Sequence, residues 1–122
     1  MKKIKLREQV SKNGTMILAG RDSGSNEYLV SQVEKDEVVF HTKEVGSPFV
    51  NIKGKPLRGD VKYAAIFCAR FSRDWKKNKS DVLIHRFKGK DIYKDKGMKK
   101  GTFGIRKYKL IRIKENEIEE FV

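Results

Sequence analysis

Residues 60–88, DVKYAAIFCARFSRDWKKNKSDVLIHRFK, decide the fold class of this chain. Asp60 is a suitable N-cap for the strongest helical pattern in the sequence. Apolar residues then follow at helical spacing, at Val61, Ala64, Ala65, Cys68, Phe71 and Trp75. Residues 80–88 alternate as a strand does, placing Val82, Ile84 and Arg86 opposite Leu83, His85 and Phe87. A long helix that leads directly into a strand predicts a mixed α+β domain.

The sequence before this segment predicts a hairpin, a short helix and two more strands. Residues 5–10 and 15–19 flank Asn13-Gly14, and Asn-Gly is a strong hairpin signal. Ser23 or Ser25 then suits the cap of a helix that runs to about residue 33. Strands are expected over residues 37–42 and 49–53, with a turn at 46–48 between them.

The sequence after this segment predicts a lysine-rich loop and two closing strands. The loop covers residues 97–101, the strands cover 102–105 and 108–114, and residues 115–122 form an acidic tail. We therefore expect one domain over residues 1–122. Its fold is α+β, with a mixed, mainly antiparallel sheet of about six or seven strands and two helices.

Positive charge is the strongest feature of the composition. The 122 residues include 29 Lys and Arg against 16 Asp and Glu, for a net charge of +13. Residues 70–114 alone hold 17 basic and 4 acidic residues, so the whole excess lies in one continuous segment. Such self-repulsion destabilises a folded chain and is relieved by a polyanion, which predicts a nucleic-acid partner. An aromatic content of 10% argues against a disordered chain.

Several other classes of protein are disfavoured. Cys68 is the single cysteine, so no internal disulfide and no zinc cluster is expected. Lys2 and Lys3 are followed by no apolar run of the kind a signal peptide needs, and no stretch approaches the roughly 20 apolar residues of a membrane span. The expectation is a cytoplasmic protein without metal or cofactor, not bound to a membrane and not an enzyme in its own right.

Two short motifs resemble those of a known family. Residues 20–22, Gly-Arg-Asp, are followed by Asn-Glu at 26–27. Residues 40–43, Phe-His-Thr-Lys, are followed by Gly-Ser at 46–47. These resemble the Gly-Arg-Asn…Asn-Asp start and the aromatic-x-His-x-Lys…Gly-Ser-His run of the NFACT-R domain.

A third motif and the order of the elements extend the resemblance. Lys-Gly-Met at 96–98 with Gly-Thr-Phe at 101–103 resembles the Lys-Gly-Met…Gly-Ser-Phe run of the same domain. The similarity covers roughly residues 11–114. NFACT-R usually forms the C-terminal part of NEMF/RqcH-like ribosome quality-control proteins, also called fibronectin-binding-protein-A-like. Those proteins bind the large ribosomal subunit and tRNA around an obstructed nascent chain.

The resemblance implies an RNA-binding α+β module whose partners are rRNA, tRNA or the large ribosomal subunit. The chain resembles a stand-alone member, and whether a protein partner supplies the other family domains stays open at this point. Two positions depart from the family pattern. Val39 stands where the family often has Trp, and Pro48 stands where Gly-Ser-His ends in His. The loss of that second His argues against a catalytic pair in the motif.

Basic side chains are the main candidates for phosphate contact. Arg70, Arg73, Lys76 and Lys77 fall on the last turns of the predicted helix, where they also complement its dipole. A second basic ridge follows in the next strand and loop, and the alternative for each of its members is a solubilising surface residue. That ridge comprises Arg86, Lys88, Lys90, Lys94, Lys96, Lys99, Lys100, Arg106 and Lys107.

The motif residues are a second group of candidates. His41 and Lys43 point to one face if the strand continues that far, and could contact a phosphate or a ribose hydroxyl. Arg21 and Asn26 either bind a phosphate near a helix start or hold the loop in place. The rings of Tyr93, Phe103 and Tyr108 interleave with basic residues and either stack on bases or belong to the core.

Other functions remain open at this stage. An RNA-processing or RNA-modifying enzyme could use His41 and His85 as acid and base, and finding both on one surface would favour it. A permanent architectural protein of the ribosome has the same charge pattern. DNA binding is less favoured because no recognition-helix motif is present. Binding to an anionic membrane surface lacks a basic helix with a free apolar face.

Overall fold

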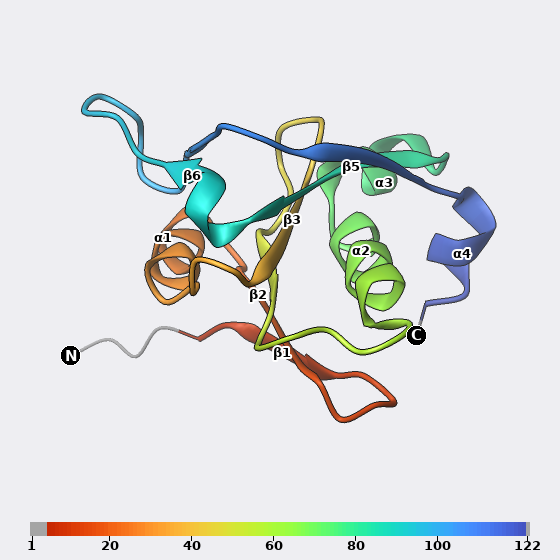
Figure 1. Cartoon of the computed structure of the whole chain (residues 1–122). Coiled ribbons are helices and arrows are strands. Elements are labelled where there is room, and N and C mark those ends of the chain that lie inside the picture. The colour runs from red at the N-terminus through yellow and green to blue at the C-terminus, as the bar shows by residue number, and fades with distance from the viewer. Residues whose placement is uncertain (1–4, 122) are drawn as a thin grey trace.

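The computed structural model describes residues 5–121 and contains one large antiparallel sheet with helices on both faces (Figure 1). Its six strands lie in the order β1-β2-β4-β3-β5-β8, and β6 and β7 form a second, two-stranded sheet. The predicted α+β class with a mainly antiparallel sheet is confirmed. In chain order the elements are β1 (Arg7–Val10), β2 (Met16–Ala19), α1 (Ser23–Ser31), β3 (Val38–Thr42), β4 (Val50–Ile52), α2 (Asp60–Arg70), α3 (Arg73–Asn78), β5 (Val82–Lys88), a 3₁₀ turn (Gly89–Asp91), β6 (Ile92–Tyr93), β7 (Gly104–Ile105), β8 (Lys109–Ile113) and α4 (Glu115–Glu119).

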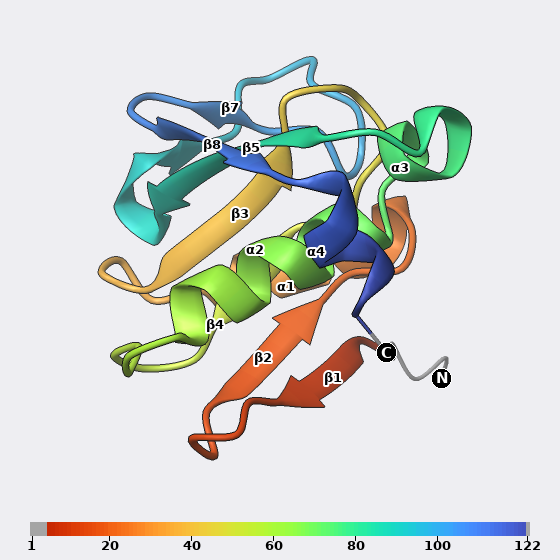
Figure 2. The same ribbon diagram turned by 90° about the vertical axis from the view of Figure 1, so that its right-hand side faces the viewer.

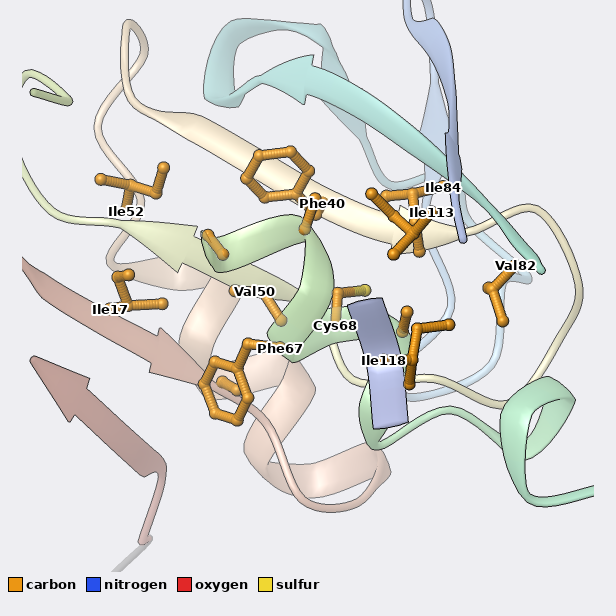
Figure 3. Packing of buried hydrophobic residues seen from close by; sticks show 14 of the residues in the cluster. Ile17, Phe40, Val50, Ile52, Phe67, Cys68, Val82, Ile84, Ile113 and Ile118 are labelled. Carbon is orange, nitrogen blue, oxygen red and sulfur yellow. The ribbon is translucent and has the colours of Figure 1, made fainter. Parts of the chain in front are cut away.

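The face of the sheet covered by α2 holds the larger part of the core (Figure 3). Ile17, Phe40 and Ile84 project from three strands onto the apolar stripe of α2, which includes Phe67 and Cys68. The spacing of that stripe follows the sequence pattern because one turn of helix brings every third or fourth residue to the same side. Burial raises the pKa of the Cys68 thiol to about 12, so the thiol is protonated and unreactive.

The opposite face is covered only in part. Leu29 of α1 packs there with Val39, Phe49 and Phe87, beneath the β6–β7 sheet. Figure 2 shows the sheet spread between β1–β2 at one edge and β5–β8 at the other. His41 and His85 alternate with core residues of β3 and β5, so they lie on this second face.

The predicted long helix is two helices. α2 ends at Arg70, and the chain restarts as α3 at Arg73. Ser72 causes the restart: its hydroxyl donates to the carbonyl of Ala69 and accepts from the backbone N–H of Trp75, so it caps α3. The expectation that Arg70 and Arg73 lie on one continuous helix is therefore wrong, although Trp75 is buried in the core as the spacing indicated.

Asp60 is not the N-cap of α2, which begins after Gly59 in a left-handed conformation (φ 90°). The Asp60 side chain is buried and accepts hydrogen bonds from the Thr15 hydroxyl, the Asn13 amide and the backbone N–H of Leu57. Those bonds, the one from Thr15 foremost, hold the pKa of Asp60 well below its usual range. The carboxylate thus joins the tip of the β1–β2 hairpin to the start of α2.

Three smaller expectations also change. Asp22, rather than Ser23 or Ser25, caps α1, and Ser25 completes the capping box. The acidic tail contains a helix, α4, whose Ile118 is fully buried against α2. Strand β6 had no prediction, because a two-residue strand has too few positions to show alternation. Val122 of the tail, like Lys2 and Lys3, lies outside the described residues.

Candidate nucleic-acid interface

An open groove of about 800 Å³ runs along the uncovered part of the second face. We call it the first groove. Its walls come from the start of α1, the β3–β4 loop, the start of α3 and the loop between β6 and β7. Its basic lining residues are Arg7, Arg21, Lys43, Arg73, Lys76 and Lys100. Its acidic lining residues are Asp22 and Glu44.

A second groove of about 590 Å³ adjoins the first. It lies over β5 and the segment that leads into β8, and Tyr108 lines both grooves. Asp91 is its one acidic lining residue. Its basic lining residues are Arg86, Lys88, Lys90, Arg106, Lys107 and Lys109. The two grooves therefore form one basic surface that meets at a tyrosine.

The cations of both grooves carry uncompensated charge. Twelve Lys and Arg line the two grooves against three carboxylates. Within residues 5–121, salt bridges are made by Lys53, Lys62, Lys94 and Arg112, and none of these lines either groove. Carboxylates thus neutralise cations elsewhere on the surface and leave the grooves positive, which is the arrangement that attracts an anionic ligand.

The structure divides the predicted RNA-binding residues into three groups. The first groove contains Arg21, Asn26, His41, Lys43, Arg73, Lys76 and Lys100. The second groove contains Arg86, Lys88, Lys90, Arg106 and Lys107. The residues that line neither groove are Arg70, Lys77, Lys94, Lys96 and Lys99. Of these, Arg70 places its guanidinium 5.7 Å from the ring centre of Phe71.

The sequence analysis missed two of the basic residues that line the grooves. Arg7 lies on β1, far from the basic segment, and its guanidinium donates to the carbonyl of Gly20 (2.6 Å) and covers Phe71 at 4.8 Å. A lone arginine on an edge strand gives no pattern signal. Lys109 was read only as part of a closing strand, although its position next to Lys107 and Tyr108 in a run of exposed residues could have indicated it.

A row of rings crosses the floor of the first groove. Phe103 packs edge-on against Phe49 (5.5 Å between centres), and Phe49 lies 4.5 Å from the ring of His41. His41 and His85 are direct cross-strand partners on β3 and β5, and the ring of His85 lies 4.1 Å from that of Tyr108. Both histidines therefore lie on one surface, which is the condition that favoured an acid–base pair.

The two histidines are held toward the neutral form. Burial lowers the pKa of His41, with a smaller contribution from the nearby His85. Burial also lowers the pKa of His85, and the charge of Lys43 adds to that effect. The Nδ1–H of His41 donates to the carbonyl of Thr42 (2.8 Å), which leaves Nε2 as the free acceptor. At neutral pH neither ring is a ready proton donor.

Comparison with known proteins assigns the chain to a family. The profile of the NFACT protein RNA-binding domain matches residues 5–107. The chain belongs to this family. The resemblance stated from its motifs is thus confirmed.

Two curated relatives are similar in sequence to this chain over about three quarters of its length. The archaeal Rqc2 homolog aRqcH of Methanocaldococcus jannaschii is 33% identical over 102 residues, which cover 77% of this chain and 15% of that protein. The Rqc2 homolog RqcH of Bacillus subtilis is 33% identical over 93 residues, covering 75% of this chain and 16% of that protein. The chain therefore spans about one sixth of the length of either relative.

A solved structure shows the same fold. The C-terminal part of the fibronectin/fibrinogen-binding protein from Streptococcus suis superposes with a TM-score of 0.83 at 27% identity. The match covers 98% of this chain and 49% of the solved one.

None of the helices within residues 5–121 has the length and apolar character that a membrane span requires.

Part of the first family motif has a structural role in this NFACT RNA-binding domain. The Oδ1 of Asn26 accepts the backbone N–H of Phe49 (3.1 Å), which ties α1 to the start of β4. A Cβ at position 20 would lie 1.9 Å from that same oxygen, so a side chain there would displace the Asn26 amide from this bond. Asn26 is thus engaged with the protein, whereas Arg21 beside it is exposed in the first groove.

The third motif docks the β6–β7 loop onto α1. The N–H of Gly101 donates to Glu27 (2.6 Å), and a Cβ at Gly101 would lie 2.7 Å from the backbone of Ser23. Lys94 bonds the same Glu27 and the carbonyls of Lys99 and Thr102. The backbone that Gly101 approaches closely is therefore that of α1.

Proposed function

We propose that this chain binds RNA of the ribosome, namely rRNA of the large subunit or tRNA, and acts in cytoplasmic ribosome quality control. The observation that carries the proposal is the set of twelve groove cations without an ion-pair partner among the described residues. Membership of the NFACT RNA-binding domain family supports RNA as the polyanion, and the Rqc2 relatives support the pathway.

The mechanism is electrostatic docking on structured RNA. Lys and Arg side chains contact phosphates, which sets affinity and position without reading sequence. Each phosphate contact releases condensed counterions, so affinity falls steeply with salt. The two grooves offer cations on either side of Tyr108, and a nucleic-acid backbone crossing that point meets both sets.

We further propose that this domain supplies RNA affinity to a larger functional unit that contains other domains. The relatives are about six times longer than the matched region, and this chain spans 15–16% of them. In such an arrangement this domain contributes RNA affinity while the remaining activities come from the other domains.

The proposal is tested by co-sedimentation with ribosomes and separated subunits over a salt series, with free tRNA as competitor. We expect binding to the large subunit that weakens with salt. The R73E/K76E variant reverses two groove charges. It should make the negative slope of log affinity against log salt shallower by about two units, because each lost phosphate contact removes about one unit. Affinity at low salt should fall about 10-fold or more.

A matched control separates location from net charge. The K12E/K55E variant changes the net charge by the same amount at two exposed lysines outside both grooves. It should keep the wild-type salt slope within about half a unit. Equal losses in the two variants, or absence of wild-type binding to ribosomes and tRNA at near-physiological salt, would contradict the proposal.

RNA cleavage is a second candidate, favoured by the direct pairing of His41 with His85. One neutral imidazole can act as base, but the second must be protonated to act as acid, and both pKa values are lowered. Incubation of end-labelled RNA with the protein in EDTA tests this. Cleavage that increases toward acidic pH and is lost in H85A would establish the enzyme; intact RNA would leave binding as the function.

A further inference from the structure

Tyr108 combines three properties that no other aromatic residue of the groove surface has. It is 54% exposed, it lines both grooves, and its ring lies 4.1 Å from the ring of His85. By contrast, Phe49 is 3% exposed, and Phe103 packs against the core cluster on this face. The sequence left open whether these rings stack on bases or belong to the core. Phe103 is a core residue, whereas Tyr108 presents its ring to solvent.

The neighbours of Tyr108 extend this surface, with the ring of His85 tilted by 36° against that of Tyr108. His85 pairs directly with Leu110 across β5 and β8, so Leu110 lies on the same face of the sheet as His85. Leu110 is 52% exposed. A neutral imidazole, a phenol ring and an isobutyl group therefore form a small apolar patch with basic grooves on both sides.

An apolar ring between two groups of cations suits an unpaired nucleotide. A base that is splayed out of a helix exposes its π face, and proteins bind such faces by stacking on aromatic side chains while Lys and Arg hold the flanking phosphates. Paired bases in an A-form duplex have their faces covered by neighbouring base pairs. A duplex can use the cations of these grooves but not the ring.

We propose that Tyr108, supported from beneath by His85, is a stacking platform for an unpaired base, so that the preferred ligand is RNA with a single-stranded segment, loop or bulge. The phosphates on one side of the base then lie in the first groove, near Lys43 and Lys76. Those on the other side lie in the second groove, near Arg106 and Lys107. This inference rests on the proposed RNA-binding function and specifies its ligand.

The test compares the Y108A and Y108F variants on two probes of equal length. One is a single-stranded oligouridine with a single 2-aminopurine near its centre, and the other is a blunt RNA duplex. Stacking contributes a factor of about 10 per base. We expect Y108A to bind the single strand about 10-fold more weakly and the duplex within about 2-fold of the wild type. The salt slope should not change, because no charge is removed.

Two controls complete the design. The Y108F variant keeps the ring and should bind as the wild type does, with the same quenching of 2-aminopurine fluorescence. Y28A removes another tyrosine, 47% exposed on α1 and outside both grooves, and should change nothing. Because Tyr108 is largely exposed, its replacement leaves the core intact, which circular dichroism verifies.

The outcomes separate this inference from the function on which it rests. Wild-type binding that is equally reduced on both probes by Y108A, or unaffected by it, overturns the stacking platform and leaves RNA binding in place. Quenching that persists in Y108A also overturns it. Absence of wild-type binding to both probes overturns RNA binding itself, and the platform with it.

Discussion

His41 shows at the scale of one residue how a motif side chain can belong to both the core and a groove. Its ring packs against Phe49 on one side and lines the first groove on the other. Burial lowers its pKa, followed in importance by the opposing hydrogen bond to Thr42 and by the nearby His85. Lys43 adds positive charge to the same wall.

This depressed pKa makes stability depend on pH in a definite direction. Below about pH 6.5 the unfolded chain takes up a proton at His41 that the folded chain resists. The contribution to stability is therefore complete above that pH and is lost as the pH falls. We expect the free energy of unfolding, measured with urea, to fall between about pH 7.5 and 5.5. The fall should be smaller in H41Q.

The H85Q variant is the natural comparison because His85 is less buried than His41. The decrease in the free energy of unfolding of H85Q at acidic pH should lie between that of H41Q and that of the wild type. Parallel losses in all three proteins would show that groups other than these two histidines set the acid sensitivity in this range. Asp60 is not among them, because its carboxylate takes up a proton in the unfolded chain only below about pH 5.

The sequence predicted most residue identities of the surface but not their partition. The count of basic residues in 70–114 identified the charge, and the motifs identified His41 and Lys43. Which lysines line a groove depends on tertiary contacts: Lys94 is bound to Glu27 and two carbonyls, whereas Lys100 close by is exposed in the first groove. Neither periodicity nor composition contains that information.

At the scale of elements, the β6–β7 loop is held to α1 at one glycine. Gly101 has a positive φ (82°) and close contact with Ser23, whereas Gly97 in the same loop has a positive φ (111°) and no atom within 4 Å of a Cβ placed there. Both positions strain an L-residue, but only Gly101 also lacks the space for one. Substitutions at Gly97 and Gly101 therefore allow the free-energy cost of backbone strain to be measured separately from the cost of steric collision.

We expect G97A to lower the free energy of unfolding by about 1 kcal/mol and G101A by about 2 kcal/mol or more. The additional loss comes from the collision with the backbone of Ser23 and from the weakened bond between Gly101 and Glu27. Hydrogen exchange should show faster exchange across residues 94–103 in G101A. Equal costs in the two variants would mean that the loop is not anchored at Gly101.

Long periodic elements were predictable, and their interruptions were not. The alternation in residues 82–87 placed Ile84 and Phe87 on opposite faces, as the structure confirms. The break between α2 and α3 depends on whether Ser72 bonds a carbonyl behind it or solvent, and that is decided by its burial in the folded chain. The two-residue strands owe their existence to pairing with each other.

At the scale of the whole molecule, the net charge of +13 is distributed so that the grooves remain positive. The same repulsion that attracts a polyanion destabilises the folded chain. Salt therefore has opposite effects on the two equilibria: screening stabilises the fold and weakens RNA binding.

We expect the melting temperature of the free protein to rise by about 3–6 °C between about 0.05 and 0.5 M NaCl, if screening relieves about 1 kcal/mol of repulsion. Over the same range RNA affinity should fall by orders of magnitude. Differential scanning fluorimetry and fluorescence anisotropy measure the two quantities. A melting temperature that falls with salt would show that ion pairs such as Lys62–Glu117 outweigh the repulsion.

The fully buried Cys68 allows the opening rate of the core to be measured by chemical labelling. A thiol with a pKa near 12 and no access to solvent reacts with alkylating reagents only while α2 is detached from the sheet. The alkylation rate of Cys68 in the wild-type chain therefore reports how often this core opens. A lower alkylation rate in the presence of RNA would show that RNA binding stabilises the folded core. For the same reason, a cysteine introduced beside the grooves can carry a fluorophore without competition from the native thiol.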